Sequence, residues 1–148
     1  MALWDPDNLS APRETASDAS RPRCVPPVLV VAEDEGERER LVDLLRRAGD
    51  PVVAVSGYAE AYAYLKHGAP PCVMVWDFAP NWIDGARLRW VQHLNRRQND
   101  VPLLLITPRP LSRDELRLYG AVTYLQKPVE AAALLRMVAP YCRPFQDD

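Results

Sequence analysis

The stretch Cys72–Asp77, with the sequence CVMVWD, is a run of apolar residues that ends in a carboxylate. Because both faces of such a run are apolar, it predicts a strand buried on both sides, as in the middle of a parallel sheet. Four more short runs, rich in apolar and β-branched residues, predict four more strands. They lie at residues 28–32, 52–55, 103–106 and 122–125.

Segments with a helical period separate these runs. In the first of them, Leu41, Leu44 and Leu45 share one face, and in the fourth Ser112 and Glu115 form the pattern of a capping box. The expected helices cover residues 37–48, 58–66, 84–97, 129–138 and a short segment from the capping box to residue 119. Alternating strands and helices predict an α/β fold with helices on both faces of a parallel sheet. Trp76 and Trp90 are expected in its core.

The length of 148 residues suits one domain. We expect residues 1–26 to form a flexible polar tail, 27–142 the folded domain, and 143–148 a frayed end. The formal net charge of -2 gives no basic surface for nucleic acid. No apolar run reaches the length of a membrane span and the N-terminus lacks the pattern of a signal peptide, so we expect a cytoplasmic protein.

The three cysteines, Cys24, Cys72 and Cys142, form no C-x-x-C motif. Their odd number and irregular spacing predict free thiols in a reducing compartment, and neither a zinc site nor a disulfide framework.

Polar side chains directly follow several predicted strands. Glu33 and Asp34 follow the first, Asp77 the third, Thr107 the fourth and Lys127 the fifth. In parallel α/β sheets the ligand site lies beyond the carboxyl ends of the strands, so we expect these side chains to lie together. Crowded carboxylates attract Mg²⁺, a carboxylate beside that ion can attack a phosphoryl group, and a lysine can pair with the phosphoryl oxygens. The combination predicts an aspartyl phosphate site.

In this order, the motifs resemble those of the CheY-like receiver domain, the phosphoacceptor module of two-component response regulators. The resemblance covers about residues 27–142. Its carriers are the acidic strand end Val28–Glu35, the stretch Val73–Asp77 with Asp84-Gly85, the Ile106-Thr107 pair and the stretch Tyr124–Pro128. It implies a (βα)5 flavodoxin-like fold, with a doubly wound, five-stranded parallel sheet in the order 2-1-3-4-5.

The resemblance also implies roles for single residues. Asp77 matches the phosphoacceptor, Lys127 the conserved cation of the family, Thr107 the hydroxyl that contacts the phosphoryl group, and Tyr124 the aromatic that switches with it. The bond before Pro128 is expected to be cis. The implied Mg²⁺ ligands are Glu33, Asp34, Asp77 and the main-chain carbonyl of Ala79.

Two registers of the acidic pair are open. An alignment without a gap places Ala32 and Glu33 on the two acidic positions of the family, so that the first carboxylate is missing. A shift of one residue in the loop pairs Glu33 with Asp34 and completes the set. The Mg²⁺ site is accordingly either weakened or normal.

Two loops depart from the family pattern. Pro80 comes one residue early after Asp77, and bulky Trp82 is expected in the same loop, over the site. The segment Pro108–Pro110 replaces a small residue in the loop that normally moves with Thr107, which predicts restricted motion.

These features predict a single-domain response regulator receiver and not an enzyme in the usual sense. It would accept a phosphoryl group on Asp77 from a histidine kinase or phosphotransfer protein. It would then signal through protein contacts on the face of the fourth and fifth helices and the fifth strand, as a monomer or homodimer. The departures favour an alternative, a pseudo-receiver that binds proteins without phosphorylation. A flavodoxin-like nucleotide or flavin binder is disfavoured, because no Gly-rich phosphate loop follows the first strand.

Overall fold

The computed structural model describes residues 26–142. Within this range, five parallel strands form one sheet in the order β2-β1-β3-β4-β5. This order confirms the doubly wound, flavodoxin-like fold expected from the sequence. The predicted tail, up to residue 25, and the predicted frayed end at 143–148 lie outside the described residues. The strands are β1 (Val28–Val31), β2 (Val52–Val55), β3 (Val73–Asp77), β4 (Leu103–Thr107) and β5 (Thr123–Gln126).

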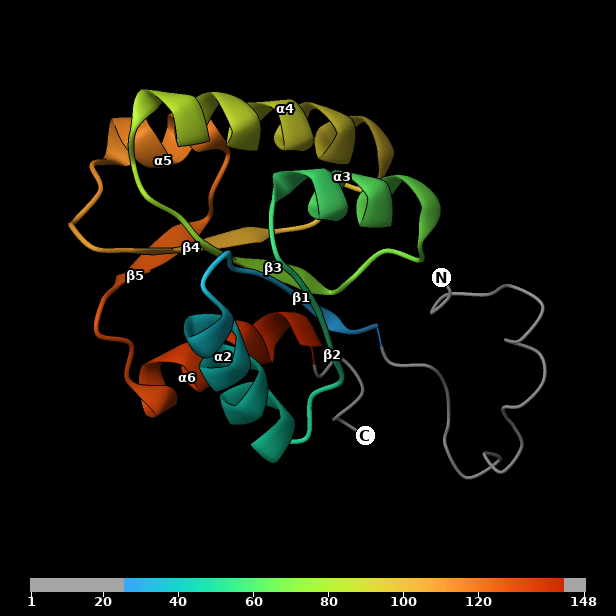
Figure 1. The fold of residues 1–148 in the computed structure, drawn as a ribbon, viewed down its shortest axis with the longest axis vertical. Helices are drawn as coiled ribbons and strands as arrows, with labels where there is room; N and C mark the ends of the chain where they lie inside the picture. The colour runs from blue at the N-terminus through green and yellow to red at the C-terminus, as the bar shows by residue number, and fades with distance from the viewer. Residues whose placement is uncertain (1–25, 143–148) are drawn as a thin grey trace.

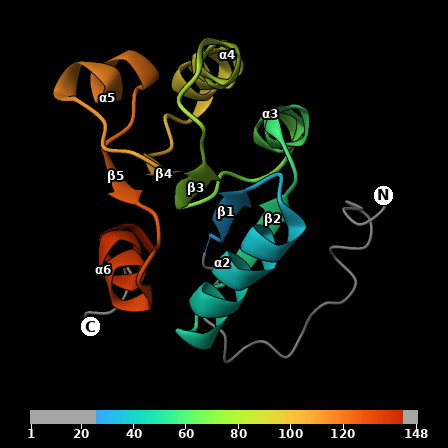
Figure 2. The ribbon, with the colours of Figure 1, turned by 60° about the vertical axis from the view of Figure 1, so that its left-hand side comes forward.

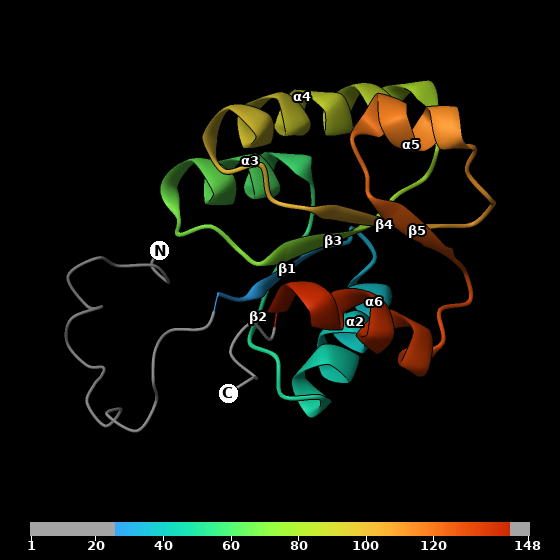
Figure 3. The same ribbon diagram turned by 180° about the vertical axis from the view of Figure 1, so that it is seen from behind.

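Helices cover both faces of this sheet, as the alternation of elements predicts. On one face lie α3 (Tyr58–His67), α4 (Trp82–Gln98) and α5 (Arg113–Tyr119); on the other lie α2 (Glu35–Arg47) and α6 (Ala131–Cys142). The two layers are seen edge-on in Figure 1 and Figure 2, and from behind in Figure 3. Among the described residues, no helix has both the length and the apolar composition needed to cross a membrane.

Alternate residues of each buried strand feed two separate cores. In β1, Leu29 and Val31 pack with the α3–α4–α5 layer, whereas Val28 and Val30 pack with α2 and α6. Successive side chains of a strand point to opposite faces, so a strand between two helical layers must be apolar throughout. This is the physical reason why the uninterrupted apolar runs identified the strands correctly.

Side-chain caps fix where several helices begin. Asp34 accepts a hydrogen bond from the Glu37 amide, so α2 begins at Glu35, two residues before the predicted start. Asn81 caps α4 in the same way, and that helix begins at Trp82. The predicted capping box at the start of α5 is present.

β5 and α6 also differ from their predicted bounds. β5 lies one residue later than predicted, because Thr123 to Gln126 pair with Leu104 to Thr107. α6 continues through Pro140 to Cys142, four residues beyond the predicted end, and Cys142 is buried against the α2–α6 side of the sheet.

The prediction that Trp90 belongs to the core is wrong, because its side chain is 47% exposed. Trp90 stacks on Tyr62 with ring centroids 4.0 Å apart and meets the edge of Tyr58. These aromatic contacts with α3 cover part of the indole and leave the rest at the surface. Trp76 is buried, as predicted.

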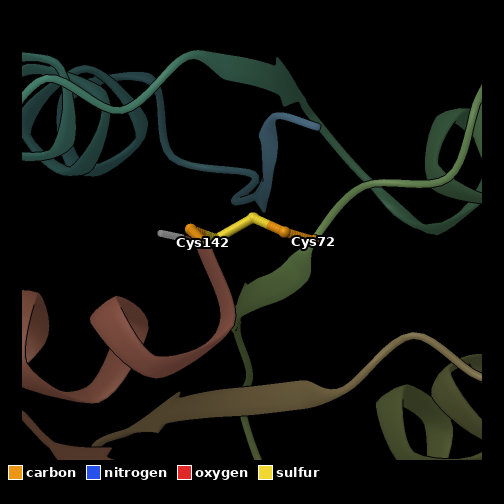
Figure 4. The surroundings of a disulfide bond; sticks show 2 residues. All are labelled: Cys72 and Cys142. Atoms are coloured by element: carbon orange, nitrogen blue, oxygen red, sulfur yellow. A yellow bond between two sulfur atoms is a disulfide. The ribbon is translucent and has the colours of Figure 1, made fainter. Parts of the chain in front are cut away.

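The prediction of free thiols is wrong for two of the three cysteines. Cys72 and Cys142 form a disulfide with a Cα–Cα distance of 5.5 Å (Figure 4). It joins the residue before β3 to the end of α6, so two positions 70 residues apart in sequence are adjacent in space. The spacing of cysteines in the sequence does not show which of them are adjacent in the fold. Because two of the cysteines form a disulfide, cysteine usage no longer supports a reducing compartment. Cys24 lies outside the described residues.

Candidate functional site

The carboxyl ends of the central strands bring Asp77 and Lys127 together. Asp77 is the last residue of β3, and Lys127 directly follows β5 with a cis bond to Pro128, as expected. The Lys127 Nζ lies 2.8 Å from the Asp77 Oδ1, and the side chains are 37% and 13% exposed respectively. A partly buried ion pair of this length holds the carboxylate in place.

A cavity of about 260 Å³ opens over this pair. Its charged lining consists of four carboxylates and two cations. The remaining lining residues are uncharged. The charged lining residues are Glu33, Asp34, Asp77, Asp84, Arg87 and Lys127, and the others include Ala32, Gly57, Tyr58, Trp76, Phe78 and Ala79. The structure therefore places most of the predicted site residues around one cavity.

The residues that follow β1 differ in their positions and contacts. Val31 pairs with Trp76, so Ala32 continues β1 beside Asp77. The carboxylate of Asp34 caps α2. Arg38 donates hydrogen bonds to the carbonyls of Ala32 and Glu33, at 2.8 and 3.4 Å, and so places a guanidinium at the end of β1.

These groups do not fit Mg²⁺ in the way that the resemblance implies. Among the described residues, no three Asp, Glu, His or Cys side chains are arranged to hold a metal ion. The Asp77 carboxylate is paired with Lys127, and the Ala79 carbonyl accepts a hydrogen bond from the Asn81 amide at 2.8 Å. Mg²⁺ requires near-octahedral oxygen ligands at about 2.0–2.1 Å, and the described side chains supply no group of three such ligands.

Thr107 is fully buried and is not part of the cavity lining. Its hydroxyl donates a hydrogen bond of 2.6 Å to the carbonyl of Arg109. The Arg109 guanidinium in turn bonds Glu115 at 2.8 and 3.3 Å. The loop after β4 is therefore tied both to the strand it leaves and to the helix it enters.

These contacts also shift the pKa values of the charged side chains that make them. The hydrogen bonds from Arg109, and then from the Ser112 amide, lower the pKa of Glu115 from 4.5 to about 2. The same pairing with Glu115 raises the pKa of Arg109. Both shifts arise because each hydrogen bond favours the charged form of its partner.

Two other predicted residues lie at the margin of the site. Tyr124 is half-buried and packs against the core on the side of α3, α4 and α5, and its switching role stays a prediction. The expectation that Trp82 lies over the site is wrong. It is the first residue of α4, is 82% exposed and does not line the cavity.

Sequence reasoning missed Arg87 and Tyr58. Arg87 lies on α4 within 3.6 Å of Asp84 and 4.7 Å from the centroid of the Tyr58 ring. The i, i+3 spacing from Asp84 gave a weak signal for the ion pair. Nothing in the sequence indicated that α4 turns this arginine toward the cavity, because that depends on how α4 packs against α3.

No protein-family model matches the chain. One curated relative is an uncharacterised 14.6 kDa protein of Leptolyngbya boryana, 29% identical over 123 residues, which are 82% of this chain and 93% of the relative. Its name gives no function.

Solved structures show what the fold is. The chemotaxis protein CheY4 of Vibrio cholerae has a TM-score of 0.66 and 21% identity, covering 80% of this chain and 99% of its own. The response regulator TrrA of Thermotoga maritima, solved in complex with Mg²⁺ and BeF, has a TM-score of 0.65 and 21% identity, over 78% and 98% of the two chains. The chain therefore has the CheY-like receiver fold, as the resemblance implied.

Proposed function

We propose that this chain is a receiver-type signalling module whose phosphoacceptor is Asp77. The single observation that carries the proposal is the ion pair of Asp77 with Lys127, 2.8 Å long, at the open cavity beyond the carboxyl ends of the strands. This is the place where ligands bind in doubly wound sheets. The Lys127 ammonium is positioned to pair with the oxygens of a group attached to Asp77.

The donor is a phosphohistidine of a histidine kinase or phosphotransfer protein. The free carboxylate oxygen of Asp77 attacks phosphorus and forms a P–O bond while the P–N bond to the histidine breaks. The electron pair of that bond returns to the imidazole, which takes a proton from solvent. The Asp77 Oδ1 lies 2.8 Å from the Lys127 Nζ, so we assign the attack to the other carboxylate oxygen, Oδ2.

The output is protein contact on the face formed by α5, β5 and α6. Val122 before β5 is 50% exposed, and Leu118 on α5 is equally exposed and lines the groove between α4 and α5. Exposed apolar side chains of this kind mark interaction surfaces when they cluster. The tie between Thr107, Arg109 and Glu115 lies at the start of α5 and would couple this face to the cavity.

Labelling with acetyl phosphate tests the proposal. Wild-type protein should take up one phosphoryl group, and Asp77→Asn should take up none, as read by intact-protein mass spectrometry. Asp43→Asn is the matched control, because Asp43 is an exposed carboxylate of α2 that pairs with Arg47 away from the cavity. Label that persists in Asp77→Asn would refute the assignment.

A second candidate is a pseudo-receiver, a protein-binding module that acts without phosphorylation. It is favoured by the buried bond of the Thr107 hydroxyl and by the lack of a three-carboxylate metal site among the described residues. Its expected signature is a wild-type protein that takes no label and whose tryptophan fluorescence is unchanged by Mg²⁺ and beryllofluoride. Trp76 lines the cavity and would report either ligand.

A further inference from the structure

Arg87 adds a second cation to the cavity that holds Asp77 and Lys127. It comes from α4, whereas Lys127 follows β5, so the two positive groups reach the same space from different elements. The cavity of about 260 Å³ is far larger than the roughly 30 Å³ that one water occupies in the liquid, so a phosphate-sized group fits between its walls.

The present ion pair of Arg87 is a loose one. Its ion pair with Asp84 is 3.6 Å long, and the two side chains are 43% and 34% exposed. Asp84 also accepts a hydrogen bond of 3.1 Å from the Asn81 amide group, so it keeps a partner when Arg87 turns away. Exposed ion pairs contribute little, and the guanidinium can therefore leave Asp84 at small cost. The guanidinium carbon also lies 4.7 Å from the centroid of the Tyr58 ring, a contact that keeps the guanidinium beside the cavity.

The negative charge around the cavity favours a second cation beside a bound phosphoryl group. A phosphoryl group brings about two negative charges to a space already lined by four carboxylates. No three of the described carboxylates are arranged to hold the metal ion that could offset them. An arginine fork binds phosphate oxygens in a bidentate manner, which a lysine cannot do.

We infer that Arg87 is an anion-binding residue of this site. Together with Lys127, it holds a phosphate-like dianion over Asp77 in the absence of a metal ion. The inference rests on the proposed function in taking the phosphoryl group as the anion. It goes beyond that function in assigning a residue of α4 the charge-neutralising task.

The test uses inorganic phosphate as the probe and the full chain with Asp77→Asn, which cannot form an aspartyl phosphate and lacks the repelling carboxylate. Phosphate is titrated in the presence of EDTA and binding is followed by calorimetry. We expect saturable binding that weakens at least about tenfold when Arg87→Met is added. Arg87→Lys should give an intermediate affinity, because it keeps the charge and loses the fork.

Arg89→Met is the matched control. Arg89 lies two residues along the same helix, is exposed and lines a different groove, so its loss should leave phosphate affinity unchanged. Equal affinities with and without Arg87, an equal loss with Arg89→Met, or no saturable binding at all would overturn the inference.

The outcome is separable from that of the phosphoacceptor proposal. Wild-type protein that takes label from acetyl phosphate, with phosphate binding indifferent to Arg87, would keep the proposed function and reject the anion role. Phosphate binding that depends on Arg87, in a protein that takes no label, would keep the anion role and reject the phosphoacceptor.

Discussion

Ala32 is the residue that most separates this site from a three-carboxylate metal site. It continues β1 beside Asp77, where its methyl group cannot bind a cation. The next two residues do not replace it equally, because Asp34 is engaged as the cap of α2 while Glu33 is exposed. We therefore expect any cation at this site to depend on Glu33 and Asp77, with fewer protein oxygens than the resemblance implied.

A second set of residues shows what polar side chains do when they are buried. Gln92 and Asn95 lie on α4 and are 5% and 1% exposed. Asn95 bonds both the amide and the carbonyl of Val101, at 2.8 and 2.9 Å, and donates to Gln92. Gln92 donates to the carbonyls of Tyr119 and Gly120. These hydrogen bonds hold α4 against Val101, which precedes β4, and against the end of α5.

Asn95→Ala should lower the free energy of unfolding by about 3 kcal/mol. It leaves the buried amide and carbonyl of Val101 without partners, and an unsatisfied buried polar group costs about 1–3 kcal/mol. Urea unfolding followed by circular dichroism measures the change. Asn99→Ala is the control, because Asn99 is exposed at the end of the same helix and its loss should stay within about 0.5 kcal/mol. Equal effects of the two substitutions would contradict the assigned role of Asn95.

At the scale of elements, the strands could be predicted from the pattern of apolar residues, and the order of the sheet from the resemblance to receiver domains. Runs such as Val73–Asp77 are apolar on both faces, and only a central parallel strand has two covered faces. The start of α5 was equally predictable, since the bonds of its capping box are local. Trp90 was misplaced because helical spacing gives a face, and only the packing of α3 decides how much of that face is covered.

The candidate site was predictable only in part. Residues that end strands, such as Asp77 and Lys127, meet because the strand order brings them together. The buried hydroxyl bond of Thr107 could not be foreseen, because it depends on the path of the loop through Arg109. Arg87 was missed for a related reason, since it reaches the cavity from the middle of a helix.

The loop between β4 and α5 should make stability depend on pH through Glu115. Its pKa is lowered to about 2 in the folded protein, so the ionised carboxylate stabilises the fold. This stabilisation is fully present above the unfolded value near 4.5 and is lost as the pH falls through the folded value. Glu115→Gln should therefore lower the urea midpoint at neutral pH, and the difference from wild type should close between about pH 4.5 and pH 2.

The partner of Glu115 supplies the control for this prediction. In an Arg109→Met background, Glu115→Gln should have much less effect, because the largest cause of the lowered pKa is already gone. A difference between Glu115→Gln and wild type that is the same at pH 2 and pH 7 would show that the tie does not exist in solution.

At the scale of the whole molecule, the disulfide and the candidate site lie at opposite ends of β3. Cys72 directly precedes the strand and Asp77 ends it. The disulfide fastens the end of α6 to the central strand, and the Asp77 cavity has no lining residue from α6. The two features should therefore be independent, one acting on stability and the other on ligand chemistry.

Replacing both Cys72 and Cys142 by alanine should lower the free energy of unfolding by about 4 kcal/mol. A link that closes a loop of about 70 residues restricts the unfolded chain, and the loss of that restriction stabilises the unfolded state by this order. Urea unfolding of wild type should show the same drop on adding dithiothreitol, and the double variant should not respond to it. Phosphate binding in the Asp77→Asn background should remain unchanged by the loss of the disulfide. If dithiothreitol does not change the unfolding of the wild-type protein, these cysteines are free thiols, as the sequence predicted. If the loss of the disulfide weakens phosphate binding, the two ends of β3 are coupled.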